Sequence, residues 1–113
     1  MLDFSNAAYG VTKVAQHFYT RAMHIEEPWL ISLTIDPGSA FPLSDCKTSP
    51  ANVGANRFVQ TDMGTAAAHW FGIDKAAISV EESTAGVVGV IDASTKDTHS
   101  GKLFTYLGPQ VAW

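Results

Sequence analysis

Tyr9 and Lys13 are the residues in this chain whose types and spacing best suit chemistry. They lie four positions apart in a segment with helical periodicity, so both side chains should occupy one face of a helix. A lysine ammonium beside a tyrosine phenol stabilises the phenolate, which suits the phenol to proton transfer as a general acid or base. The same spacing also occurs in ordinary exposed helical pairs, so the pair alone does not distinguish a catalytic role from a surface role.

The segment from Ser5 to Glu27 is predicted to be the long amphipathic helix that carries this pair. Its apolar residues recur at intervals of three and four, which predicts a buried stripe made of Val11, Val14, Phe18, Ala22 and Ile25. Tyr9 and Lys13 fall largely off that stripe. Pro28 disfavours helical geometry at the residue before it, so the helix should end at Glu27.

A short apolar segment, residues 30–35, follows the helix and predicts a strand buried on both faces of a parallel sheet. Asp36-Pro37-Gly38 should end this strand as a turn. Residues 39–57 then show neither helical nor strand periodicity, and they contain two prolines. A stretch of that length without periodicity indicates a functional lid, a disordered insert or a wrong assumption about the chain.

The second half of the chain predicts two more helices. Residues 61–71 are rich in alanine and should form a short helix that ends at Gly72 and acts as a mobile cover. Ser79 and Glu82 form a capping box, which predicts the start of a helix over residues 80–93. This helix should turn Val87, Val88 and Ile91 inward, while Gly86 and Gly89 permit close packing on a sheet.

Residues 94–100 should form a polar loop, and the alternation from Lys102 to Leu107 predicts a final strand. The expected order is therefore helix, strand, helix, helix, strand. Strands separated by helices indicate a right-handed parallel crossover, so the predicted class is α/β. Two strands make a poor sheet, which suggests that upstream strands are missing.

Length and composition restrict the function further. A chain of 113 residues with 46% hydrophobic content has room for one domain with a core. The net charge of −4 and the presence of only two arginines argue against nucleic-acid binding. Cys46 is the single cysteine, so no internal disulfide is expected and an intracellular setting fits. The absence of a leader or long apolar run predicts a soluble cytoplasmic protein without a membrane partner.

Three motifs taken in order, Tyr9-Gly-Val-Thr-Lys13, an apolar strand ending in Pro37-Gly38, and Val59 to Gly64, resemble the C-terminal half of short-chain dehydrogenases/reductases. Val80 to Ser83 and His99 to Lys102 are similar to the small fungal ketoreductase-type members of that family. The resemblance covers residues 1–38 and 58–107. It implies the C-terminal part of a Rossmann-like doubly wound parallel sheet that lacks the N-terminal cofactor-binding strands, as a single partial domain over residues 1–113.

The resemblance also implies an oxidoreductase that uses NADP, or NAD, on a small-molecule carbonyl or alcohol substrate. Tyr9 would deliver a proton to the substrate oxygen, and Lys13 would hold the nicotinamide ribose hydroxyls. The implied cofactor-binding residues are Tyr9, Lys13, Pro37, Gly38, Val59 and Thr61, and residues 62–78 would form the substrate lid. No metal site is implied.

Two departures from the family pattern bear on activity. None of the nine glycines forms the glycine-rich turn that cradles a cofactor pyrophosphate, and neither Ser5 nor Asn6 matches the upstream catalytic serine and asparagine. The chain is therefore interpreted as the terminal half of a reductase. It would be active only if the cofactor-binding half is present in a longer product or is supplied by a partner. The stretch 39–57 separates segments that the family places side by side, which fits a retained intron, a gene-model error or a genuine insertion.

Two other functions are considered. A non-catalytic remnant or oligomerising interaction module, including a homo-oligomer, would follow if apolar helix and strand faces remain exposed. Metal-dependent hydrolysis is disfavoured because the four histidines show neither HExxH nor Cys-His ligand spacing: His17, His24, His69 and His99.

Overall fold

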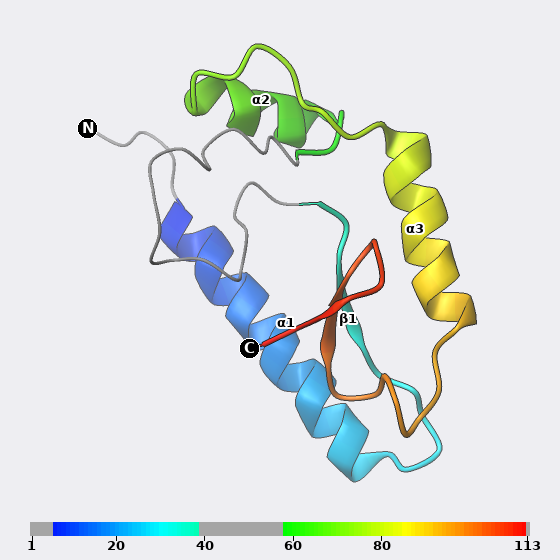
Figure 1. The fold of residues 1–113 in the computed structure, drawn as a ribbon. Helices are drawn as coiled ribbons and strands as arrows, with labels where there is room; N and C mark the ends of the chain where they lie inside the picture. Colours follow the sequence, from blue (N-terminus) through cyan, green and yellow to red (C-terminus); the bar gives the residue numbers. More distant parts are fainter. Residues whose placement is uncertain (1–5, 39–57, 113) are drawn as a thin grey trace. The chain divides into compact units, whose positions relative to one another are not determined.

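The computed structural model of the chain describes residues 6–38 and 58–112 (Figure 1). These residues fall into two compact units. The first contains the described residues up to Thr34 together with Ser94–Lys102, and the second contains the described parts of Ile35–Ala93 and of the chain from Leu103 onward. The predicted insert at 39–57, which includes Cys46, lies outside the described residues.

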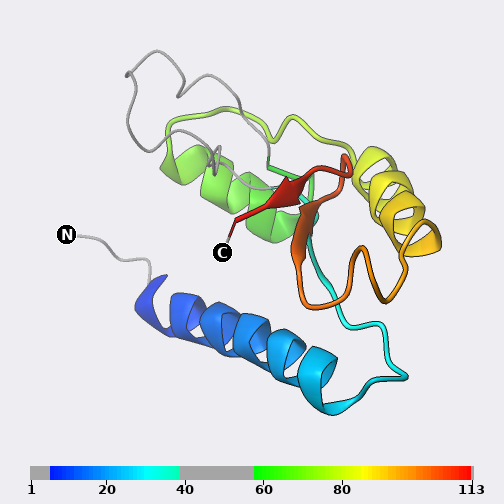
Figure 2. The same cartoon turned by 60° about the horizontal axis from the view of Figure 1, so that its bottom comes forward.

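The first unit contains α1, which spans Asn6–Glu26 as one continuous helix of 21 residues (Figure 2). The predicted helix is therefore confirmed to within one residue at each end. Its last helical hydrogen bond runs from Glu27 N to Met23 O, just before Pro28. Among the described residues, neither this helix nor any other has the length and apolar content that crossing a membrane requires.

The predicted burial of the apolar stripe on α1 is wrong. Ala22 is half-buried. The other four residues of the stripe are between 69% and 73% exposed: Val11, Val14, Phe18 and Ile25. The physical reason is that the hydrogen bonds and contacts which α1 makes within its unit involve other positions. Thr20 bonds Thr34 through the two hydroxyls at 3.2 Å, and His24 lies against Gly101.

The residues between α1 and the sheet were predicted as a strand from residue 30, whereas β1 spans only Thr34–Asp36. The strand begins later than predicted because the backbone of Ser32 forms hydrogen bonds with the turn at Ser100 and Gly101 and not with a neighbouring strand. Its N–H donates to Ser100 Oγ at 3.0 Å, and its carbonyl accepts from Gly101 N at 2.6 Å. Burial on both faces is also incorrect, since Ile31 is 40% exposed.

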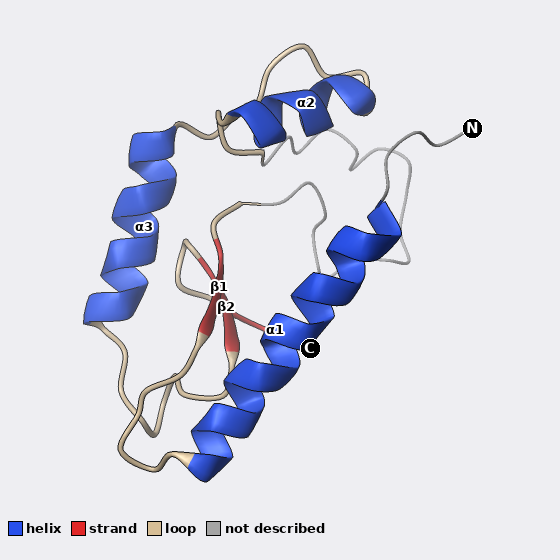
Figure 3. Cartoon of the chain, turned by 180° about the vertical axis from the view of Figure 1, so that it is seen from behind, coloured by secondary structure: helices blue, strands red, loops and turns tan. Residues whose placement is uncertain are grey.

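The sheet has three strands in the order β1-β2-β3, with β2 at Leu103–Thr105 and β3 at Gln110–Val111 (Figure 3). Strands β1 and β2 run parallel, and β2 and β3 pair antiparallel. The α/β class and the final strand are therefore confirmed in a mixed sheet. β3 was not predicted, because a two-residue strand carries no periodicity in the sequence. The buried apolar residues of the described chain are Ala68, Ala76, Ile78, Val90, Leu103, Phe104 and Tyr106.

Two capped helices complete the second unit: α2 at Asp62–Trp70 and α3 at Val80–Asp92 (Figure 1). Both predicted helices are confirmed, as is the capping serine, since Ser79 Oγ accepts from Glu82 N at 3.0 Å. Gly72 follows α2 with a φ of 74°, a left-handed conformation that suits glycine at a helix end.

The inward face of α3 differs from the prediction. Ser83 and Val90 are buried and Val87 is half-buried, while Val88 and Ile91 are 48% and 50% exposed. The buried positions recur at intervals of three and four, as expected for one face of a helix. Gly86 shares this face, and its missing side chain lets Tyr106 approach the helix. The contact between α3 and the residue after β2 therefore occurs at the glycine, not at the longest apolar run.

Candidate functional site

Tyr9 and Lys13 meet on α1. The Lys13 ammonium lies over the Tyr9 ring, with 5.3 Å between Nζ and the ring centroid. This is a cation–π contact, which contributes about 0.5–1 kcal/mol at an exposed site. The phenol remains accessible, because Tyr9 is 45% exposed. The arrangement thus keeps a positive charge beside an accessible phenol.

The pair lies on the side of α1 opposite the apolar stripe. At 100° per residue, Tyr9 and Lys13 share a face with Thr20 and His24, whereas Phe18 lies on the other side. Thr20 and His24 are the positions at which α1 contacts other segments of its unit. The face that carries the pair is therefore the one that packs within the unit.

The C-terminal end of α1 is held by Lys96. Its ammonium donates to three carbonyl oxygens at the C-terminus of α1 and beyond, those of His24, Glu27 and Leu30, at 2.9, 3.0 and 2.8 Å. A cation is favourable there because the carbonyls at a helix C-terminus carry partial negative charge. Lys96 thus fixes the direction in which the chain leaves the helix.

The turn at Pro37-Gly38 lies in the second unit and is held by its neighbours. Gly38 N donates to Asp36 Oδ1 at 3.0 Å, and Gly38 has a φ of 141°. Ser83 Oγ donates to the Pro37 carbonyl at 2.7 Å, and Tyr106 N donates to the Asp36 carbonyl at 2.9 Å. Nothing in the sequence indicated that Ser83 contacts this turn, because Ser83 and Pro37 are 46 residues apart.

Val59 and Thr61 lie in the second unit as well. Val59 forms an isolated parallel bridge with Ile78, and its carbonyl accepts from Thr61 N at 2.7 Å. Thr61 caps α2, where its Oγ1 accepts from Gly64 N at 3.1 Å. A hydroxyl that accepts in this way still has its own hydrogen to donate. Gly64 is needed at its position, because any Cβ there would overlap the Val59 carbonyl.

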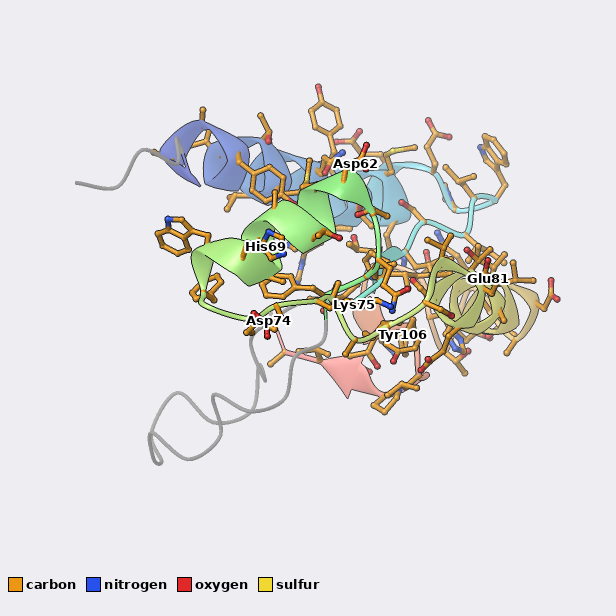
Figure 4. The ribbon with its side chains drawn as sticks, turned by 90° about the horizontal axis from the view of Figure 1, so that it is seen from above. Asp62, His69, Asp74, Lys75, Glu81 and Tyr106 are labelled. Carbon is orange, nitrogen blue, oxygen red and sulfur yellow. The ribbon has the colours of Figure 1, made fainter. Side chains whose placement is uncertain are left out.

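The predicted site residues therefore lie in separate groups. Tyr9 and Lys13 are in the first unit, whereas Pro37, Gly38, Val59 and Thr61 are in the second. The described part of the chain holds no cluster of three His, Cys, Asp or Glu side chains that could bind a metal ion. His69 instead bonds the carbonyl of Asp74 at 2.8 Å (Figure 4).

The sequence identifies the chain as related to the C-terminal portion of the short-chain dehydrogenase/reductase family. It matches the C-terminal third of fungal norsolorinic acid ketoreductases and of a short-chain dehydrogenase, which confirms the resemblance seen in its motifs. No family model matches the chain.

The chain is 36% identical over 117 residues to a norsolorinic acid ketoreductase of Aspergillus parasiticus, an alignment that covers 100% of this chain and 36% of that protein. A norsolorinic acid ketoreductase of Dothistroma septosporum is 33% identical over 94% of the chain and 33% of its own length. The short-chain dehydrogenase RED3 of Pyricularia oryzae is 26% identical over 98% of the chain and 37% of its own length. The chain thus spans about a third of the length of the curated relatives it matches.

Proposed function

We propose that this chain supplies the proton-donating part of an NAD(P)-dependent oxidoreductase that acts on a carbonyl or alcohol substrate. The observation that carries the proposal is the position of the Lys13 ammonium over the ring of the exposed Tyr9, 5.3 Å from the ring centroid. The relationship to ketoreductases supports a carbonyl substrate. We further propose that residues 1–113 form one partial domain, equivalent to the C-terminal part of a Rossmann-like doubly wound sheet.

The chemistry of the donor set fits the nicotinamide end of such a cofactor. Lys13 offers ammonium donors and Tyr9 a hydroxyl, which suit ribose hydroxyls, and Thr61 keeps a hydroxyl hydrogen that suits a carboxamide. The cofactor, NADP or alternatively NAD, supplies hydride chemistry when bound. None of the nine glycines of this chain forms the glycine-rich turn that would bind the pyrophosphate of the cofactor.

In this proposal Tyr9 donates its phenolic proton to the oxygen of the substrate carbonyl. Lys13 stabilises the phenolate that remains, because an ammonium favours a neighbouring negative charge. In the direction of alcohol oxidation, the phenolate accepts the proton instead. The turn at Pro37-Gly38 and the backbone at Val59 and Thr61 would hold the nicotinamide, and residues 62–78 would cover the substrate.

A chimera tests this function directly. The C-terminal third of the Aspergillus parasiticus norsolorinic acid ketoreductase is replaced by this chain, and NADPH-dependent reduction of norsolorinic acid is followed. Activity above that of the relative lacking its C-terminal third is the expected result, since the chain would restore the proton donor. A folded chimera that binds NADPH but reduces no ketone would contradict the proposal.

A second candidate function, an oligomerising interaction module, is favoured by the exposed apolar stripe of α1 defined above. Contiguous apolar surface of this kind is common at protein interfaces. In this case sedimentation velocity would show concentration-dependent association, and Phe18→Glu would abolish it. Gln16→Glu is the matched control, because position 16 is an exposed position of the same helix that already carries a polar residue. A chain that remains monomeric at all concentrations would exclude this function.

A further inference from the structure

We infer that Ser83 is a positioning residue for the nicotinamide end of the cofactor, acting through the Pro37-Gly38 turn. This inference rests on the proposed function, in which that turn contacts the nicotinamide. Ser83 itself contacts neither substrate nor cofactor in this scheme. Its role is to fix the orientation of one peptide group.

Ser83 is suited to this role by its burial and its partner. It is 5% exposed on the inward face of α3, and its Oγ donates to the Pro37 carbonyl at 2.7 Å across 46 residues of sequence. The start of α3 is fixed in turn by the Ser79 cap. A buried hydroxyl is costly unless it is hydrogen-bonded, so the Ser83–Pro37 bond is needed where it lies.

The other end of the same peptide group is fixed too. The peptide that joins Pro37 to Gly38 carries the Gly38 N–H, which donates to Asp36 Oδ1 at 3.0 Å. The Asp36 carbonyl accepts from Tyr106 N, and the Tyr106 hydroxyl donates to Glu82 Oε1 at 3.3 Å. Figure 4 shows the Tyr106 side chain beside the helix that carries Glu81.

This bonding determines how the turn can meet a ligand. The Gly38 N–H and one lone pair of the Pro37 carbonyl are used inside the protein, so they do not specify the ligand by hydrogen bonding. Pro37 is exposed, and Gly38 has no side chain. The turn therefore offers a small apolar surface, which suits the flat face of a nicotinamide ring. Without the Ser83 hydroxyl the peptide can rotate and this surface loses its fixed orientation.

The test uses the 113-residue chain and reduced nicotinamide mononucleotide, which carries the nicotinamide and ribose but not the adenosine half. Binding is followed by amide NMR shifts, and saturation at about millimolar concentration is expected for half a cofactor. Ser83→Ala and Ser83→Cys should shift the Gly38 amide and weaken binding about three- to tenfold, because neither provides a strong hydroxyl donor. Ser83→Thr, which keeps the hydroxyl, should bind reduced nicotinamide mononucleotide with the affinity of the wild-type chain.

Thr84→Ala is the matched control, because Thr84 is an exposed neighbour on the same helix. It should leave the Gly38 amide and the affinity unchanged. Equal binding by wild type, Ser83→Ala and Ser83→Cys would overturn the inference and leave the proposed function intact. No saturable binding by the wild-type chain would instead count against the nicotinamide site of the proposed function, and the positioning role would be rejected with it.

Discussion

Tyr106 lies directly against Gly86. A Cβ added to Gly86 would approach the Tyr106 carbonyl oxygen to 2.5 Å and the Tyr106 ring to 2.6 Å. This contact joins α3 to the residue that follows β2, and the same residue donates its N–H to Asp36 at the end of β1. The close approach therefore contributes to the position of the Pro37-Gly38 turn.

Gly86→Ala should destabilise the chain by about 1–3 kcal/mol, because the new methyl group must displace backbone as well as a ring. Gly89→Ala is the matched control on the same helix, since a Cβ there meets nothing within 4 Å. That variant should be neutral or more stable by up to about 1 kcal/mol, given the low helix propensity of glycine. Urea unfolding compares the two free energies, and equal effects would argue against the packing role of Gly86.

Lys96→Met should lower the free energy of unfolding by about 1–3 kcal/mol, because it leaves three carbonyl oxygens without their charged donor. The methionine keeps most of the length of the side chain. Lys102→Met is the control, since among the described residues the Lys102 ammonium bonds one carbonyl, that of Thr98, at 2.7 Å. Urea unfolding should show the larger loss at position 96, with faster amide exchange in the last turn of α1. A larger loss at position 102 would contradict this account.

Ser79→Ala should cost about 1 kcal/mol, the usual effect of removing an N-cap side chain. The hydroxyl accepts from Glu82 N, and alanine leaves that donor to water. Ser79→Asp should retain the stability, because an aspartate also caps and its charge suits a helix N-terminus. Thermal unfolding measures all three proteins. The prediction fails if alanine and aspartate behave alike.

Tyr9→Phe should reduce the turnover of the chimera by about 10²- to 10⁴-fold, the usual contribution of a general acid. The substitution removes one oxygen atom and keeps the ring under the Lys13 ammonium. The NADPH affinity should change little by comparison. Tyr19→Phe serves as the control, because Tyr19 is a 69% exposed tyrosine of the same helix. If both variants keep the parent rate, Tyr9 is not the proton donor.

Several elements could be read from the sequence because local chemistry specifies them. Spacings of three and four residues and a following proline define α1, and the Ser79–Glu82 capping box marks the start of α3. The order of the tyrosine-lysine, Pro-Gly and Val59–Gly64 motifs was sufficient to recognise the family. Helix propensity and capping act over a few residues, so they are visible without a fold.

Only the tertiary structure decided which faces are covered and which turns are held. The apolar stripe through Phe18 looked buried in the sequence, yet α1 contacts its unit through Thr20 and His24. Ser32 lies outside β1, contrary to the prediction, because its hydrogen-bond partners are Ser100 and Gly101, which are distant in sequence. Ser83 reaches Pro37 only through folding. Sequence periodicity can define the faces of a helix, but the contacts of each face depend on segments that folding brings near.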